Sequence, residues 1–462
     1  MKNLPALYMT ISTGWAIRNF IYTGIVERLS QRFAVVLLCD SQFYVAAKEA
    51  VKGTSVRALM FDVKVEPFGW RVMRQFRKKI YLDCRKSQTE KIWETYGKRS
   101  FVKRASGHLV KALIWMLGSQ RLQRFAMKLD LFINSTSGAD DMLRQAPSNA
   151  FFFATHASSF FEESLFRAAK KYCQRTVLMI LSWDHLSSKI VLGPGFDHLF
   201  VWNVVSKQEI LDTLDFYAAD QIHIVGAPQF DIYAKPSTCS YNSWCLEYNL
   251  DPAKKTILFS TIPQVRNDGQ HRVLQMMAHR FLQEPEIFGD VQILVKVHPL
   301  DTFSVYDTVR IFPFIKFVEK QFGQMSVADE YALEANRDAL SHAVLNINTF
   351  STMTLEAAFL DCPIVHLAFD LDGQSNAVPT EKYYEFEHFK PITESGCAAM
   401  SRSFDDLINN IILILQNIET RSSARRNVAK QYFSDTIGSA ADNVYYKTLE
   451  ITYSKLQFQG SD

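Results

Sequence analysis

The sequence contains few cysteines, no long apolar run and almost no net charge. Its seven cysteines are odd in number and form no CxxC pair, which argues against a disulfide framework and a zinc site. No window approaches about 20 consecutive apolar residues, and the N-terminal apolar run is too short and interrupted for a secretory signal. A net charge of +3 is too small to indicate a nucleic-acid partner. These absences favour a protein of the reducing cytoplasm.

Apolar residues are plentiful instead. They make up 48% of the 462 residues, enough for a large core divided between two or more domains. Short apolar runs alternate with helical patterns along the chain, which predicts parallel sheets with helices on both faces. The predicted strands are 6–11, 34–38, 150–154, 176–181, 199–202 and 222–225, then 256–259, 291–297, 344–347 and 363–368.

The two groups of strands predict two Rossmann-like domains that face one another across a cleft. Residues 235–255 carry Pro, Ser and Asn clusters typical of a linker. We therefore predict an N-terminal domain over 1–235 and a C-terminal domain over 236–438, with a last helix at 439–457 that returns to the first domain.

Residues 344–366 predict an anion site, because a hydroxyl-rich turn separates a buried strand from a helix. Thr349, Ser351 and Thr352 form the turn, and the free N–H groups of the helix point toward it. Glu356, one helical turn further on, is suited to bind a ribose diol. The segment therefore indicates a nucleotide, although Ser and Thr are also ordinary helix caps.

A second strand of the same domain ends in Lys296, His298 and Pro299. Ligands of open α/β sheets bind at the carboxyl ends of the strands, so these residues and the hydroxyl turn are expected to face one site. Lys296 and His298 can donate hydrogen bonds to phosphate oxygens. Ser260 and Thr261, which follow strand 256–259, are expected on the same side.

In the first domain the candidate catalytic residues also follow strands. Asp184 lies in the sequence SWDH after strand 176–181 and is the leading candidate for the base, with turn capping as the alternative. His156 and Glu162 follow strand 150–154 and form a second candidate set. Gly14, Arg18 and Asn19 belong to a glycine turn that lacks GxGxxG, and we expect this turn on the acceptor side.

Residues 71–128 are rich in Lys and Arg, which are interleaved with aromatic residues. Basic helices with apolar faces are typical of segments that lie on anionic membranes. We predict a helical insertion over about 68–128 that contacts such a surface, while a solvated helical excursion remains the alternative.

The chain resembles GT-B glycosyltransferases of bacterial surface polysaccharide synthesis. The resemblance rests on SWDHLSSK at 182–189, VGAPQFD at 225–231, VKVHPL at 295–300 and the segment NINTFSTMTLEAAFLDCPIV. It includes the His-Pro-motif sialyl- and Kdo-transferases, the CDP-glycerol glycerophosphotransferases and UDP-N-acetylglucosamine 2-epimerase.

The resemblance implies specific roles for residues of both domains. His298, Pro299, Ser351 and Thr352 would contact the donor phosphates, and Glu356 the ribose. Lys189, in the first of these motifs, is expected on the acceptor side. The acidic motif that supplies the base in the family has no clear counterpart here.

The predicted reaction moves a sugar from a nucleotide-sugar, a co-substrate, to a glycan or lipid-linked acceptor in capsule, O-antigen or lipopolysaccharide synthesis. No cofactor is expected. Asp370 and Asp372 form a DxD pair, but we expect them, with Gln374, in a loop near the donor sugar, with a plain surface loop as the alternative. We predict a metal-independent enzyme on the inner face of the membrane. CDP-alditol phosphate transfer, UDP-sugar 2-epimerisation and a non-catalytic assembly scaffold remain alternatives.

Overall fold

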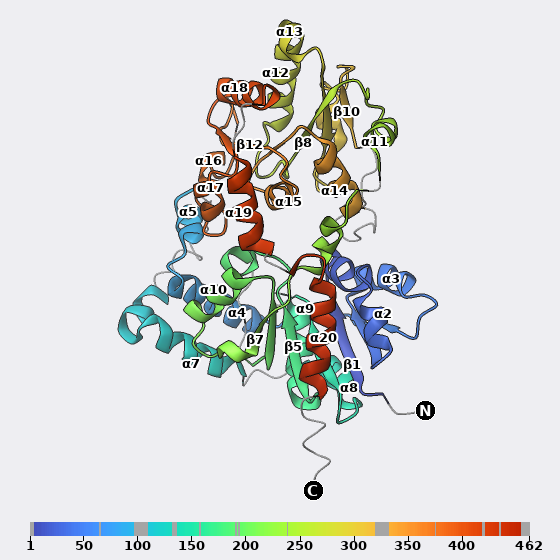
Figure 1. Cartoon of the computed structure of the whole chain (residues 1–462). Helices are drawn as coiled ribbons and strands as arrows, with labels where there is room; N and C mark the ends of the chain where they lie inside the picture. Colours follow the sequence, from blue (N-terminus) through green and yellow to red (C-terminus); the bar gives the residue numbers. More distant parts are fainter. Residues whose placement is uncertain are drawn as a thin grey trace.

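The computed structural model describes two lobes, each built around one parallel sheet (Figure 1). The described residues are 4–63, 66–96, 110–131, 136–156, 159–189, 192, 195–237, 239–318, 332–374, 376–417, 421–433 and 436–453. The predicted α/β class with two parallel sheets is confirmed.

The sheet of the first lobe has seven strands in the order β3-β2-β1-β4-β5-β6-β7. Every neighbouring pair is parallel. Most of these strands are nearly continuous apolar runs, as expected for strands covered on both faces. The strand order reverses between β1 and β4, where such sheets bind ligands. The strands are β1 Ala6–Ile11, β2 Ala34–Cys39, β3 Arg57–Met60, β4 Phe151–Ala154, β5 Arg175–Met179, β6 His198–Val201 and β7 Ile222–Ile224.

The sheet of the second lobe has six strands in the order β10-β9-β8-β11-β12-β13, all parallel. Its order reverses between β8 and β11, so both lobes repeat one topology. The strands are β8 Lys255–Ser260, β9 Val291–Lys296, β10 Ile315–Phe317, β11 Leu345–Asn348, β12 Ile364–Leu367 and β13 Ala399–Ser401.

Three strands were not predicted from the sequence, and all three lie at sheet edges. β3 has four residues, and its Leu59 and Met60 are exposed. β10 and β13 have three residues each. Short edge strands carry too little of the apolar pattern to be recognised from it.

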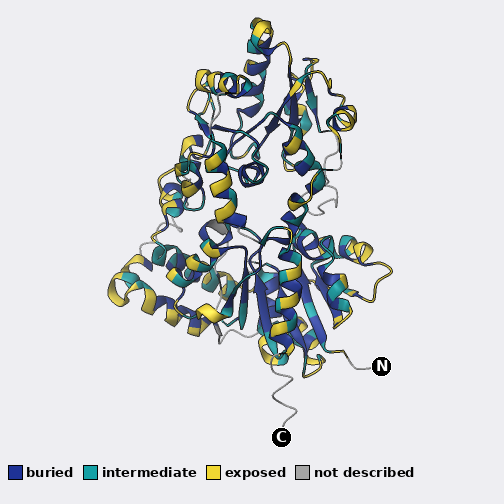
Figure 2. Cartoon of the chain, in the orientation of Figure 1, coloured by how far each residue is buried: buried dark blue, intermediate teal, exposed yellow. Residues whose placement is uncertain are grey.

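Helices cover both faces of each sheet, and the buried residues concentrate along the strands, which are dark blue in Figure 2. One further apolar cluster continues from the first lobe into the second and includes Trp183, Trp202 and Leu355. The helices of the first lobe are α1 Gly14–Ala16, η1 Ile17–Ile21, α2 Ile25–Ser30, α3 Ser41–Ala50, α9 Phe160–Tyr172, η2 His185–Lys189, α10 Val204–Thr213 and η3 Ala219–Gln221. The chain crosses from the first lobe to the second through η4 Pro228–Ala234. The helices that follow are α11 Tyr241–Glu247, α12 Gln270–Gln283, α13 Pro285–Phe288, η5 Phe303–Tyr306, α14 Ala332–His342, α15 Met353–Phe359, α16 Thr380–Tyr383, α17 Lys390–Glu394 and α18 Phe404–Leu415.

The basic insertion between β3 and β4 is helical where it is described. It contains α4 Phe68–Cys84, α5 Gln88–Tyr96, a helix at 110–117, α7 Ser119–Leu131 and α8 Ser137–Arg144, whereas 97–109 lies outside the described residues. Buried Arg77 donates to Asp130 of α7 at 3.0 Å and to Glu163 of α9 at 2.5 Å. Across the described parts of the chain, none of the helices has both the length and the hydrophobicity that a membrane span requires.

The chain returns to the first lobe through its last helices, α19 Ser422–Phe433 and α20 Ala440–Tyr453. Val444, Tyr445 and Ile451 of α20 join the apolar core of the first sheet. The Asp231 carboxylate, in the crossing segment η4, accepts from the backbone N–H groups of Gly438 (2.8 Å), Ala440 (3.1 Å) and Ala441 (2.8 Å). Residues 454–457 of the predicted last helix lie outside the described residues.

Removing the Asp231 carboxylate, which caps the start of α20, should destabilise the protein. Asp231→Ala leaves three N–H groups at the start of α20 without their acceptor, so we expect a loss of about 1–2 kcal/mol and a lower thermal unfolding midpoint. Asp442→Ala is the matched control, since Asp442 lies in the first turn of the same helix and its exposed ion pair with Arg28 is worth at most about 1 kcal/mol. Equal midpoints for Asp231→Ala and the wild type would contradict the capping role.

Candidate functional site

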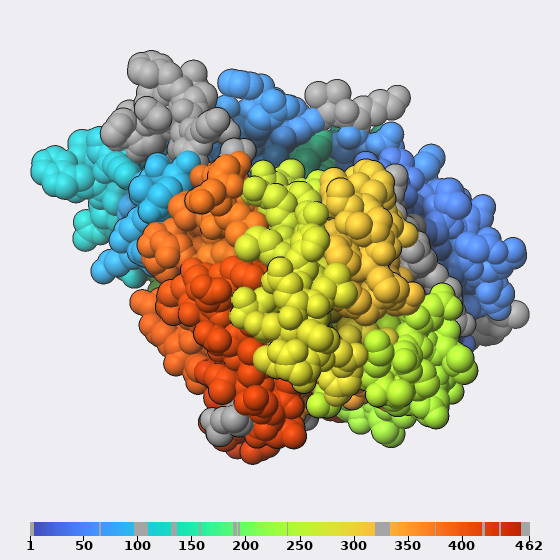
Figure 3. Space-filling model, turned by 90° about the horizontal axis from the view of Figure 1, so that it is seen from above, coloured from blue at the N-terminus to red at the C-terminus, as the bar shows by residue number. Residues whose placement is uncertain are grey.

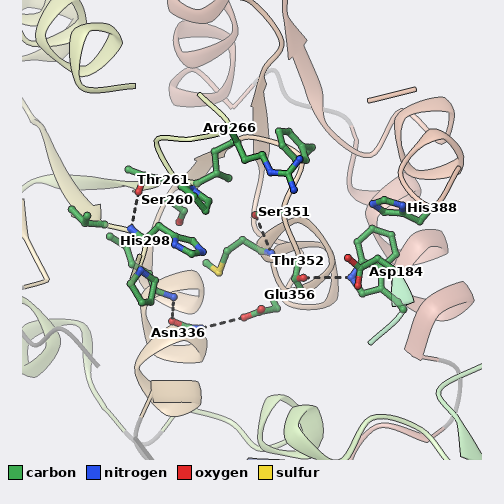
Figure 4. A pocket seen from close by; sticks show the side chains of 18 of the residues that line it. Asp184, Ser260, Thr261, Arg266, His298, Asn336, Ser351, Thr352, Glu356 and His388 are labelled. Carbon is green, nitrogen blue, oxygen red and sulfur yellow. Dashed lines mark hydrogen bonds between the residues drawn. The ribbon is translucent and has the colours of Figure 1, made fainter. Parts of the chain in front are cut away.

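A cavity of about 460 Å³ lies between the two lobes, at the carboxyl edge of the second sheet (Figure 4). Trp15, Trp93, Trp183 and Asp184 come from the first lobe, and the rest of the wall comes from the second. The predicted residues that line it are Asp184, Ser260, Thr261, Lys296, His298, Pro299, Ser351, Thr352 and Glu356. The structure therefore brings most of the predicted donor residues to one site.

His298 is held as a neutral hydrogen-bond donor. Its backbone N–H donates to the Thr261 hydroxyl at 2.8 Å, and the Leu300 N–H donates to its Nδ1 at 3.2 Å. Burial, with a smaller effect from Lys296, lowers the pKa of His298 to about 4. A neutral imidazole that accepts at Nδ1 carries its proton on Nε2, so the ring presents one N–H for a ligand.

The hydroxyl turn connects the second lobe to the first. Ser351 accepts from the Met353 N–H at 3.2 Å, at the start of the short helix α15. The Trp183 indole of the first lobe donates to the Thr352 hydroxyl at 3.4 Å, across the cavity. Thr349 is fully buried, does not line the cavity, and its hydroxyl has no hydrogen-bond partner among the described residues.

Glu356 is the centre of a charge cluster to which both lobes contribute. The Tyr233 hydroxyl donates to its carboxylate, and the Asn336 amide donates to the same oxygen at 3.5 Å. Lys296 in turn donates to Asn336. Arg18, from η1 of the first lobe, interacts electrostatically with Glu356, so this predicted acceptor-side residue lies beside the predicted ribose site.

The surroundings of this cluster lower the pKa values of its two cations, Lys296 and Arg18. Burial lowers the pKa of Lys296 to about 8, Glu356 opposes this shift, and Arg18 adds to it. Burial also lowers the pKa of Arg18. Two desolvated cations share one carboxylate, so the cluster has an excess of positive charge that favours an anionic ligand.

Arg266 is a cavity residue that the sequence analysis missed. Its guanidinium lies 4.9 Å from the Trp93 ring and 5.8 Å from the Tyr383 ring. Trp93 belongs to α5 of the basic insertion, so this insertion forms part of the cavity wall. The position of Arg266 in the loop after β8 was the sequence signal that could have identified it as a site residue. Trp93 gave no such signal, because its position depends on tertiary packing.

Asp184 lies on the opposite wall, in a polar and aromatic surrounding. Ser182 donates to its carboxylate at 2.6 Å, and Ser187 is 3.1 Å from Nδ1 of His388. The His388 ring packs edge-on against Trp183 at 5.1 Å. His388 also lines the cavity and was missed, because it follows no strand and belongs to no recognisable motif.

The second set of catalytic candidates does not line this cavity. Glu162 accepts from Thr10 at 2.6 Å and from Ser12 at 2.7 Å, at the strand reversal of the first sheet. Burial raises the pKa of Glu162 to about 7, although these hydrogen bonds lower it. The His156 ring is 5.4 Å from that of His185, which in turn is 5.8 Å from the cavity residue Trp15.

The remaining acceptor-side candidates lie behind the first-lobe wall. Gly14 begins α1, and Asn19 donates to the Trp15 carbonyl at 2.9 Å and accepts from the Gln229 N–H at 3.2 Å. Lys189 ends the η2 turn, and its side chain lies outside the described part of the chain. The acceptor role of these residues stays a prediction.

The predicted donor-sugar residues stabilise a loop beside the cavity and are not part of its wall. Asp370 accepts from the Thr380 N–H at 2.9 Å and from Asn376 at 2.7 Å. Gln374 donates to Asn267 at 3.1 Å, and the Asp372 carbonyl accepts from Arg272 at 3.0 Å. Where the chain is described, no group of three or more His, Cys, Asp or Glu could hold a metal, and metal independence stays a prediction.

More than half of the chain, residues 196–450, matches the family model of CDP-Glycerol:Poly(glycerophosphate) glycerophosphotransferase. The chain belongs to this family. The resemblance inferred from the sequence motifs is therefore confirmed, and the family is one of transferases. None of the curated proteins compared with the chain matches it.

Solved structures with the same two-lobed arrangement confirm the GT-B fold. The UDP-GlcNAc 2-epimerase from Neisseria meningitidis bound to UDP-GlcNAc has a TM-score of 0.53 at 9% identity, covering 96% of this chain and 100% of that one. The Methanocaldococcus jannaschii epimerase in complex with UDP-GlcNAc and UDP has a TM-score of 0.50 at 13% identity, covering 96% and 99%. The wall teichoic acid polymerase TagF has a TM-score of 0.51 at 12% identity, covering 98% and 91%.

The lowered pKa of Lys296 predicts a pH dependence of anion binding. Only the ammonium form attracts phosphate, so affinity for UDP and CDP, measured calorimetrically, should fall as the pH rises through about 8, by up to about tenfold per further unit. Lys296→Arg should bind without this dependence, because arginine stays charged. Lys316→Arg, on the edge strand β10, is the control and should titrate like the wild type. A wild-type affinity that does not change between pH 7 and 9.5 would refute the role of Lys296.

Proposed function

We propose that the protein transfers a sugar from a nucleotide-activated donor to a hydroxyl group of a glycan or lipid-linked acceptor in bacterial surface polysaccharide synthesis. The observation that carries the proposal is the cavity between the lobes, where Lys296 and Arg18 share one carboxylate and His298 presents an N–H. Such a wall favours a phosphate-bearing ligand that both lobes contact.

The second lobe is proposed to hold the donor. Its diphosphate would be bound by Lys296, His298 and the hydroxyls of Ser260, Thr261, Ser351 and Thr352, and its ribose by Glu356. The epimerase structures support this proposal, because they share the fold and contain UDP-GlcNAc or UDP. Cationic and N–H donors also stabilise a phosphate leaving group, so the same contacts would serve the reaction itself.

The first lobe is proposed to receive the acceptor. Asp184 projects into the cavity opposite the donor residues (Figure 4), where a carboxylate can deprotonate an acceptor hydroxyl. His388 and Trp183 lie beside it and would help to exclude water from the transfer.

Replacing cavity residues should strongly reduce turnover. His298→Ala and Glu356→Gln should lower the release of nucleotide from a panel of CMP-, CDP-, GDP- and UDP-linked donors, with a glycan acceptor present, by about 10²-fold or more. His279→Ala is the matched control, because this histidine is exposed on α12 of the same lobe. Full activity of both cavity variants would exclude the assigned site.

A second candidate is alditol-phosphate transfer from a CDP-alditol, which the family match favours. Here the acceptor hydroxyl attacks phosphorus, CMP leaves, and the product gains one phosphate for each alditol. Sugar transfer adds no phosphorus to the acceptor. Product mass therefore separates the two reactions, whereas 2-epimerisation would proceed without an acceptor and a scaffold would show no turnover.

We further propose that the enzyme acts in the cytoplasm at the inner face of the membrane, through the exposed side of the insertion. Trp115 is 87% exposed and is followed by exposed Met116 and Leu117, while Phe125 and Leu129 are exposed on α7. Exposed Lys111, Arg121, Arg124 and Lys128 alternate with them. In Figure 3, α7, in cyan, projects from the side of the molecule beyond the second lobe. Apolar side chains among cations match an anionic bilayer surface.

This surface predicts binding to vesicles that contain phosphatidylglycerol, with weaker binding to pure phosphatidylcholine and at high salt. Trp115→Ser and Arg121→Glu should each reduce co-sedimentation severalfold. Val45→Ser provides the control, since Val45 is 75% exposed on α3, outside the insertion. Binding that the insertion variants leave unchanged would disprove the membrane surface.

A further inference from the structure

A continuous row of buried polar side chains crosses the second sheet and ends at the cavity. It runs from His366 of β12 through Thr354 of α15 to Asn348 and Asn346 of β11, and then to Ser260 at the end of β8. None of the five side chains is more than 4% exposed. Ser260 is the only one of them that lines the cavity.

A row of polar side chains is unusual inside a parallel sheet. Successive side chains of a strand alternate between its two faces, so Leu345 and Ile347 pack into the apolar core on one side of β11 while Asn346 and Asn348 share the other side. Buried amides inside a parallel sheet are costly unless every polar group is paired. Pairing every polar group of the row requires each hydrogen bond to run in a defined direction.

The direction is fixed at the cavity end by a backbone carbonyl. Nδ2 of Asn346 is 3.1 Å from the Leu258 oxygen, which can only accept, so this atom is the amide nitrogen. The same nitrogen donates to the Ser260 hydroxyl at 2.9 Å. Oδ1 of Asn346 must then accept, and it does so from Nδ2 of Asn348 at 2.6 Å.

The other end follows from the same reasoning. Oδ1 of Asn348 accepts from the Thr354 hydroxyl at 3.0 Å, which uses the single proton of that hydroxyl. Thr354 must therefore accept from Nε2 of His366, also at 3.0 Å. Burial lowers the pKa of His366 to about 3, so the ring is neutral and carries its proton on Nε2.

Every donor in the row consequently points toward the cavity. Ser260 receives a hydrogen bond at its oxygen, so its own proton is left for a group outside the row. We propose that this relay fixes the Ser260 hydroxyl as a hydrogen-bond donor to a phosphate group of the nucleotide donor. Asn346, Asn348, Thr354 and His366 are then positioning residues, which do not touch the ligand themselves. This inference rests on the proposed function, since it names a phosphate contact of that donor site.

The test compares ligands with and without phosphate. Ser260→Ala should weaken the calorimetric affinity for CDP or UDP by about tenfold, the size expected for a hydrogen bond to a charged group, and leave that for cytidine or uridine unchanged. Thr354→Val interrupts the relay three residues from the ligand and should weaken diphosphate binding about threefold or more. Thr354→Ser, which keeps the hydroxyl, should bind like the wild type.

The double variant distinguishes positioning from a general loss of structure. In the Ser260→Ala background, Thr354→Val should cause no further loss of diphosphate affinity. An equal loss in both backgrounds, or an equal loss for cytidine or uridine, would overturn the relay. Asn346→Leu, which removes the amide next to Ser260, must give the same pattern, and it replaces Thr354→Val if circular dichroism shows that this variant is unfolded.

The same binding measurements give a different result if the proposed function itself is wrong. A wild-type protein that binds neither CDP nor UDP would overturn the donor site and the relay together. A wild-type protein that binds them, with additive effects of Ser260→Ala and Thr354→Val, would overturn the relay alone.

Discussion

The sharing of one carboxylate by cations from both lobes is the interaction on which the rest of the site depends. Glu356 lies on α15, at the strand reversal of the second sheet, and it compensates Lys296 of its own lobe and Arg18 of the other. Tyr233, from the crossing between the lobes, donates to it as well. A buried cation is tolerated only with a partner, so this cluster holds three parts of the chain in one place. It also leaves a positive excess for an anionic ligand to neutralise.

The repeated topology explains why these groups meet. Both sheets reverse their strand order once, between β1 and β4 and between β8 and β11, and polar residues follow the strands at each reversal. In the second lobe these residues are Ser260, Thr261 and the hydroxyl turn. The first lobe places Glu162 and its hydroxyl partners at the equivalent point. The cavity lies against the second reversal, where sheets of this kind bind ligands.

The fold was largely predictable from the sequence, because the central strands are continuous apolar runs whose pattern survives without tertiary information. The edge strands β3, β10 and β13 were missed because they are short. The site residues that follow strands, such as His298 and Ser260, were predictable from topology. Arg266, Trp93 and His388 were missed for a different reason, since their positions depend on how separate segments pack. No rule of spacing relates Trp93 to Arg266, which are far apart in the sequence and in contact in the structure.

The basic insertion shows why composition alone cannot assign a role to charge. Its cations were interpreted as one signal, yet the structure divides them among different tasks. Arg77 is buried between Asp130 and Glu163, and Arg85 pairs with Glu209 and with Glu387 of the second lobe. These pairs fix α4 and its C-terminal end, which leads into α5, where Trp93 forms part of the cavity wall. Other cations of the insertion stay exposed where it is described, among them Lys111, Arg121 and Lys128, and these can act on a surface outside the molecule. Arg77 ties α7 to α4 and α9 through buried ion pairs, so a contact made by α7 would act on the same insertion that contributes Trp93 to the cavity wall.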